Sequence, residues 1–231
     1  MATTAAGDSP PAVALEEVGR AYGERVALRE ISFALAPGAT VAVFGANGAG
    51  KTTLLRILAG LLRAHAGRVV VLGAELPGEG YRARGRIGLL GHEPMLYRDL
   101  SVRENLRFHA RLHGVALARI EELVAQVGLA ARADDPVRTL SRGMTQRAAI
   151  CRAALHAPEL LLLDEPLANL DPGGAEAIEP LLRGPARVLI SHDAEEGLRA
   201  ADWVLGLRGG RQALWAPATG VTLADVRELY R

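Results

Sequence analysis

Lysine and cysteine are almost absent from this sequence of 231 residues, and neither sign of charge dominates it. Lys51 is the only lysine among 27 basic residues, and 26 acidic residues leave a formal net charge of +1. No overall field therefore draws the chain onto nucleic acid or anionic lipid. The single cysteine, Cys151, excludes an intramolecular disulfide and favours a reducing compartment. We expect Cys151 to be a small buried helix residue.

Long hydrophobic runs are also missing. No uncharged apolar stretch approaches the ~20 residues that cross a bilayer, and residues 1–11 lack the basic cluster and apolar core of a signal peptide. We expect residues 1–11 to be a disordered lead-in and residues 12–231 to form one domain, near the upper size limit of a single core. No interleaving of basic and aromatic residues predicts a nucleic-acid partner.

Short apolar runs indicate an α/β fold. From Val41 onward they alternate with helical patterns, which is typical of a parallel, helix-covered sheet, while segments joined at Pro37-Gly38 suggest an earlier antiparallel portion. The predicted strands are Val13–Val18, Ile31–Leu35, Val41–Phe44, Arg68–Leu72, Ile87–Leu90, Leu160–Asp164, Arg187–Ser191 and Trp203–Leu207.

A helical insertion interrupts this alternation. Helical patterns at Val102–Leu112, Ala116–Val127 and Arg142–Leu155, with Gly114 and Gly128 as stops, predict an inserted helical subdomain over about residues 95–157. Near the C-terminus, Thr222 as N-cap with Asp225 three residues later predicts a surface helix with Leu223, Val226 and Tyr230 on one face.

A glycine-rich loop follows the predicted strand Val41–Phe44 and precedes the apolar helix Leu54–Leu62, which is the context that a phosphate-binding P-loop requires. Its glycines allow backbone N–H groups to point at phosphate oxygens. Lysine is a compact point charge for the terminal phosphates of a nucleotide, and a threonine hydroxyl is a ligand for Mg²⁺. The loop residues are Gly45, Ala46, Asn47, Gly48, Ala49, Gly50, Lys51, Thr52 and Thr53.

Two carboxylates end the buried strand Leu160–Asp164. Asp164 is predicted to hold Mg²⁺, and Glu165, one residue further, to polarise an attacking water as general base. His192 directly follows another predicted strand, so a parallel sheet would place it at the same edge, where it would contact the terminal phosphate.

The order of motifs resembles the ATP-binding domains of ABC transporters over nearly the whole chain. Leu140-Ser141-Arg142-Gly143-Met144 resembles the LSGGQ signature, about 90 residues after the P-loop and 20 before Asp164. The resemblance implies a P-loop NTPase core with a mixed sheet, an antiparallel β subdomain and the helical insertion. It also implies that Ser141 and Gly143 contact the ATP held by a second chain in a head-to-tail dimer. Asp171 corresponds to the D-loop and His192 to the H-loop.

The same resemblance implies further roles at two positions. Tyr22 is expected to stack on adenine, and His92 stands where most members carry the glutamine that contacts Mg²⁺ and water. Arg142 and Met144 also depart from the usual glycine and glutamine. His92 together with the segment Leu106–Gly114 is similar to the ATP-binding subunit of bacterial haem exporters in cytochrome c maturation.

Several alternatives remain open at this point. ABC-2 type export ATPases for drugs, lipids or polysaccharides also carry Ser-Arg-Gly-Met signatures. A soluble ABC ATPase acting on ribosomes or DNA is disfavoured because such proteins usually carry two ATPase domains, a coiled coil or a zinc site. A binding module without turnover is disfavoured by Glu165. The resemblance implies MgATP as the bound ligand, transmembrane permease subunits as partners, no nucleic acid, and a peripheral place on the cytoplasmic face of the membrane.

Overall fold

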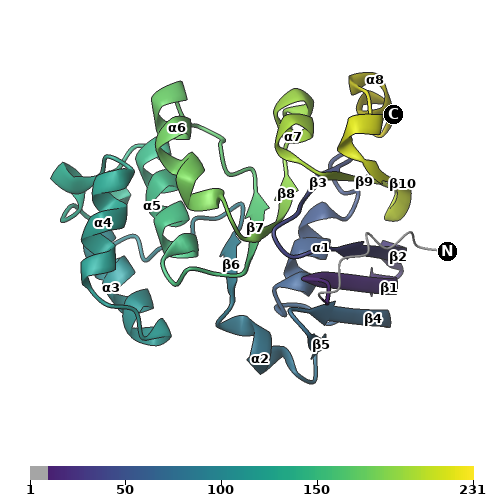
Figure 1. Cartoon of the computed structure of the whole chain (residues 1–231), viewed down its shortest axis with the longest axis horizontal. Helices are drawn as coiled ribbons and strands as arrows, with labels where there is room; N and C mark the ends of the chain where they lie inside the picture. Colours follow the sequence, from purple (N-terminus) through teal and green to yellow (C-terminus); the bar gives the residue numbers. More distant parts are fainter. Residues whose placement is uncertain (1–9) are drawn as a thin grey trace.

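The computed structural model describes residues 10–231, so most of the expected lead-in lies outside the described residues. The described strands join in the order β5-β4-β1-β2-β10-β9-β3-β8-β7-β6, and helices α3, α4 and α5 gather on the far side from β1, β2 and β4 (Figure 1). The fold class predicted from the sequence is confirmed. The strands are β1 (Val13–Tyr22), β2 (Arg25–Leu35), β3 (Thr40–Phe44), β4 (Ala66–Val71), β5 (Ala74–Leu76), β6 (Ile87–Leu90), β7 (Leu160–Asp164), β8 (Ala186–Ile190), β9 (Trp203–Arg208) and β10 (Arg211–Pro217).

The helices connect and cover these strands. They are α1 (Lys51–Leu58), α2 (Gly80–Arg84), α3 (Val102–His113), α4 (Ala118–Gln126), α5 (Arg142–Ala154), α6 (Pro172–Leu182), α7 (Ala194–Ala200) and α8 (Leu223–Glu228), with 3-10 turns at Ala130–Arg132, Val137–Thr139 and Ala218–Gly220. Between residues 10 and 231, no helix is both long enough and apolar enough to span a membrane.

The parallel half of the sheet sets up the site. β9, β3, β8, β7 and β6 pair in parallel, with Val43 opposite Ile190 and Asp164 also opposite Ile190. The carboxyl ends of β3, β7 and β8 therefore meet at one edge. β7 is buried on both faces, as expected for a parallel strand covered by helices. Leu160 and Leu162 pack into one hydrophobic core, while Leu161 and Leu163 pack into another.

The antiparallel half departs from the predicted connection. β1 pairs with β2 and β4, and β4 pairs with β5. The turn at Pro37-Gly38 was predicted to join paired strands, but it leads from β2 to β3, which are not neighbours. The strands β5 and β10 were not predicted. β5 has three residues and β10 has no fully buried side chain, so the position of each strand in the sheet depends on its partner.

Two helices differ from their predicted form. α1 begins at Lys51 and not at Leu54, because Gly50 is its N-cap with φ of 106°, and it ends at Leu58. In α8 the capping box of Thr222 and Asp225 is confirmed. Val226 is the buried residue of the helix and its C-cap Leu229 is also buried, however, while Leu223 and Tyr230 are 36% and 39% exposed.

Helices α3 to α5 share a hydrophobic core with one face of β6, β7 and β8. Ser101 caps α3 in a capping box with Glu104, and Gly114 ends it in the left-handed conformation, as the predicted stop requires. Cys151 on α5 is fully buried and its thiol contacts the carbonyl of Leu123. Burial raises the pKa of the Cys151 thiol to about 12.

We predict that Cys151 is inert in the native protein. At about pH 8 the thiolate fraction is negligible and the sulfur is covered, so an aromatic disulfide reagent should react on the order of a hundredfold more slowly than with the unfolded chain. Absorbance of the released thiol measures both rates, and the chain in guanidinium chloride is the control. Labelling of native protein at the rate of a free thiol would contradict this packing.

Candidate functional site

The predicted P-loop bridges β3 and α1, and two of its glycines are sterically required. Gly45 has φ of 146°, and a Cβ there would lie 2.2 Å from the carbonyl oxygen of Leu207. Gly50 has φ of 106°, and its Cβ would lie 2.5 Å from the carbonyl oxygen of Ala27. Any side chain would push the loop off the strands behind it, so its close approach to β2 and β9 depends on glycine.

Lys51 begins α1 and turns its ammonium back into this loop. Its side chain is nearly buried, and Nζ donates to the carbonyl oxygens of Gly45 and Ala46, the latter at 3.0 Å. Burial lowers the pKa of Lys51, and the charges of Asp164 and Glu165 oppose that shift. The backbone of the loop therefore surrounds the Lys51 ammonium and leaves it poorly hydrated. Such an arrangement suits the binding of a polyphosphate.

Asp164 and Thr52 meet across the edge of the sheet. The Thr52 hydroxyl donates to Asp164 Oδ2 at 3.3 Å, and Asp164 is buried. Burial, followed by the charge of Glu165, raises the pKa of Asp164. A nearby cation would relieve both effects. Carboxylate and hydroxyl oxygens are the donors that Mg²⁺ prefers, so these residues fit that ion.

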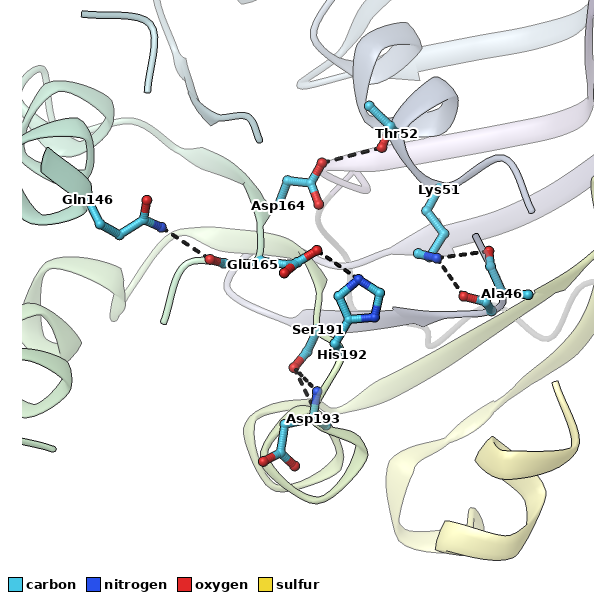
Figure 2. Close-up of polar contacts among 10 residues, drawn as sticks. Ala46, Lys51, Thr52, Gln146, Asp164, Glu165, Ser191, His192 and Asp193 are labelled. Atoms are coloured by element: carbon cyan, nitrogen blue, oxygen red, sulfur yellow. Dashed lines mark hydrogen bonds and ion pairs between the residues drawn. The ribbon is translucent and has the colours of Figure 1, made fainter. Parts of the chain in front are cut away.

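Glu165 and His192 face each other beside this pair, as Figure 2 shows. His192 Nε2 lies 2.8 Å from Glu165 Oε1. Glu165 has φ of 54°, and its backbone N–H donates to the carbonyl of Ile190 at the end of β8. That contact holds the carboxylate next to the histidine. A carboxylate oriented in this way, next to the predicted phosphate and metal groups, can accept a proton from water.

One cavity of about 570 Å³ brings most of the predicted residues together. Tyr22 on β1 lies at its wall, and Arg20 on the same strand holds its guanidinium carbon 4.9 Å from the centre of the Tyr22 ring. Gly45, Ala46 and Ala49 are outside the lining, although the first two supply carbonyls to Lys51. The lining residues are Tyr22, Arg25, Ala27, Asn47, Gly48, Gly50, Lys51, Thr52, Thr53, Arg56, His92, Asp164, Glu165 and His192.

Three predicted residues lie elsewhere. Ser141 caps α5 by accepting from the Met144 N–H at 3.2 Å, and Asp171 caps α6 by accepting from the Gly174 N–H at 3.1 Å. A Cβ on Gly143 would lie 2.8 Å from the Asn169 carbonyl oxygen, so the signature packs against the predicted D-loop. Neither Ser141, Gly143 nor Asp171 lines the P-loop cavity.

Gln146 has a contact that sequence reasoning missed. Its Nε2 donates to the backbone oxygen of Glu165 at 3.1 Å (Figure 2). It also donates to the backbone oxygen of Pro166 at 3.0 Å, so the two bonds tie α5 to the chain beyond β7. The only signal in the sequence was its place two residues after the signature. Arg25 and Arg56, which also line the cavity, carried no signal because arginine is common throughout the chain.

The histidines of the segment Leu106–Gly114 lie away from this cavity. His113 on α3 stacks on His156, with ring centres 4.0 Å apart and an interplanar angle of 13°. Burial, followed by the charge of Arg152, lowers the pKa of His109 to about 4. These side chains belong to the packing of α3 on α5, and they do not line the P-loop cavity.

A second cavity of about 610 Å³ lies between α6 and α7 and shares Glu165 and His192 with the first. Its other polar lining residues come from α6, from α7 and from β8 and the segments that flank these elements. The P-loop, Asp164 and Tyr22 are not part of it, so the residues predicted to bind phosphate and metal line the first cavity alone.

Comparisons with known proteins identify relatives of this chain. The model of the ABC transporter family matches residues 28–168. The Nod factor export ATP-binding protein I of Rhizobium johnstonii is 34% identical over 213 residues, which cover 88% of this chain and 68% of that protein. The daunorubicin resistance ATP-binding protein DrrA3 of Streptomyces coeruleorubidus is 37% identical, with 87% and 66% covered.

Two further matches extend over most of both chains. The phosphonates import ATP-binding protein PhnC of Frankia casuarinae is 40% identical over 225 residues, which cover 88% of this chain and 89% of that one. A solved structure described as the ATP binding subunit of an ABC transporter superposes with a TM-score of 0.85 at 26% identity, covering 94% of this chain and 98% of that one. The chain belongs to the ABC transporter family, in which it is an ATP-binding subunit that hydrolyses ATP in support of transport.

Proposed function

We propose that the P-loop cavity binds and hydrolyses MgATP, and that this subunit thereby drives a membrane permease. The observation that carries the proposal is the meeting of Lys51, Thr52, Asp164, Glu165 and His192 in one cavity at the ends of three parallel strands. A cation, a pair of oxygen ligands and a carboxylate base are the groups that phosphoryl transfer to water needs.

The nucleotide is bound from both ends of the cavity. Tyr22 takes the base on its ring, and the loop from Gly45 to Thr53 takes the phosphates on backbone N–H groups and on the ammonium of Lys51. In the free subunit that ammonium is satisfied by loop carbonyls. It exchanges these neutral acceptors for phosphate oxygens, which are charged and form stronger hydrogen bonds.

Thr52 and Asp164 would hold Mg²⁺, with His92 lining the same cavity. Bound there, the ion would supply positive charge next to the phosphate oxygens. Glu165 orients the attacking water and accepts its proton. His192 keeps Glu165 in place through Oε1, and it lines the same cavity as the loop, which supports a contact to the terminal phosphate.

A second copy completes the site. Ser141, Gly143 and Asp171 lie outside the cavity of their own chain, and the N-terminus of α5 presents free N–H groups that suit an anion. We propose a head-to-tail homodimer in which these residues contact ATP held by the partner. Residues 95–157 act as the helical subdomain that moves with nucleotide binding and transmits the motion to permease subunits at the cytoplasmic face of the membrane.

Two cargoes are proposed. His92 and the segment Leu106–Gly114 support haem export for cytochrome c maturation. The Ser-Arg-Gly-Met signature favours an ABC-2 type exporter of drugs, lipids or polysaccharides, and so do the relatives named for Nod factor export and daunorubicin resistance.

Lys51→Arg tests the phosphate site. A planar guanidinium is longer and wider than an ammonium, so it should displace the terminal phosphate in a loop whose glycines already contact the strands behind. We expect a loss of ATPase activity of roughly 10²-fold or more, since a 1 Å misplacement costs that much. Release of inorganic phosphate measures it. The exposed Arg29→Lys on β2 is the control, and an active Lys51→Arg enzyme would contradict the assigned role.

Glu165→Gln tests the general base. The amide keeps the size of the side chain but cannot accept the proton, so turnover should fall by roughly 10²- to 10⁴-fold while ATP still binds. The variant should then accumulate as an ATP-loaded dimer, seen as an earlier peak in size exclusion with ATP. Glu228→Gln on α8 should behave as the unmodified protein. Rapid turnover by Glu165→Gln would refute the assignment of the base.

Deletion of the gene separates the two cargoes. Haem export predicts the loss of covalently bound haem in c-type cytochromes with other haemoproteins intact, because only the former need haem delivered across the membrane. Haem staining of denaturing gels and absorption spectra measure both pools, and a plasmid-borne copy with Glu165→Gln should fail to restore them. Unchanged c-type cytochromes would favour the ABC-2 exporter.

A further inference from the structure

Arg25 stands next to Tyr22 because of the hairpin that joins β1 and β2. The two strands are connected by Gly23 and Glu24 alone, and Tyr22 and Arg25 are direct cross-strand partners. Gly23 takes a positive φ of 58°, which such a tight turn favours. The hairpin therefore positions a cation beside the aromatic ring at the wall of the cavity.

The guanidinium of Arg25 lies against the P-loop at Gly48. A Cβ on Gly48, which has φ of 81°, would lie 3.1 Å from Arg25 Nη2. Arg25 lines the same cavity as Lys51 and Tyr22. Within residues 10–231, nine arginines form ion pairs with carboxylates, and Arg25 is not among them.

We propose that Arg25 is a second cation for the polyphosphate of the nucleotide, binding the phosphate nearest the ribose. Tyr22 marks the base end of the cavity and Lys51 the terminal phosphates, and the Arg25 fork lies beside Tyr22 and over Gly48, between these two ends. A planar guanidinium forms two parallel hydrogen bonds to phosphate oxygens. This inference rests on the proposed nucleotide site and adds a binding residue that the P-loop pattern does not contain.

The position of Arg25 predicts which nucleotides it binds. A contact to the phosphate nearest the ribose is present in ATP and ADP and absent in adenosine. Arg25→Gln should therefore weaken the binding of ATP and of ADP by the same factor, roughly fivefold to tenfold. The affinity for adenosine should stay unchanged. Arg25→Lys keeps the charge but loses the fork, so its effect should be intermediate. Competition against a fluorescent ATP analogue measures all three ligands.

The matched control is Arg29→Gln, an exposed arginine on the same strand that does not line the cavity. It should bind every ligand as the unmodified protein does. Unchanged ATP affinity in Arg25→Gln would overturn the inference, and so would the same loss of affinity in Arg29→Gln. A loss of affinity for ATP but not for ADP would overturn the assignment of Arg25 to the phosphate nearest the ribose. If Lys51→Arg loses turnover while Arg25→Gln binds normally, only this inference fails. If Lys51→Arg keeps its activity, the proposed nucleotide site itself fails.

Discussion

Parallel pairing of β3, β8 and β7 is the constraint on which the site depends. Its hydrogen bonds align the carboxyl ends of three strands that come from distant parts of the chain, so Gly45, Glu165 and His192 emerge at one edge. Alternate leucines of β7 pack into different hydrophobic cores, so burial on both faces fixes this strand within the sheet. The same burial that stabilises the sheet thus also aligns the polar groups at its edge.

Burial also puts those polar groups in an electrostatic state that favours a ligand. Lys51 is nearly covered, which lowers the pKa of its ammonium, and Asp164 is covered, which raises the pKa of its carboxyl. Their mutual attraction opposes both shifts. A polyphosphate with a divalent cation would supply a charge of the needed sign to each of them, which is why a site of this kind binds both together.

The helical region is physically connected to this edge. Gln146 on α5 binds the backbone just beyond β7, and Gly143 packs on Asn169 in the chain that leads to α6. A displacement of α5 would therefore disturb the segment that carries Glu165. Cys151 and its neighbours pack on the opposite face of the same helix, so α5 is held both by its core and by the site.

The sequence by itself determined the elements whose chemistry is local. The P-loop glycines, the four leucines before Asp164 and the caps at Ser141 and Thr222 each specify their own backbone, so the core strands and the principal site residues were predictable. Tertiary structure alone decided what depends on a distant partner. β10 forms only because β9 and β2 flank it, the Pro37-Gly38 turn leads to a strand that does not pair with β2, and α8 buries Leu229 in place of Tyr230. The contacts of Gln146 and Arg25 belong to this second class, because hydrogen bonds and close approaches between residues far apart in the sequence leave no periodic or compositional trace along the chain.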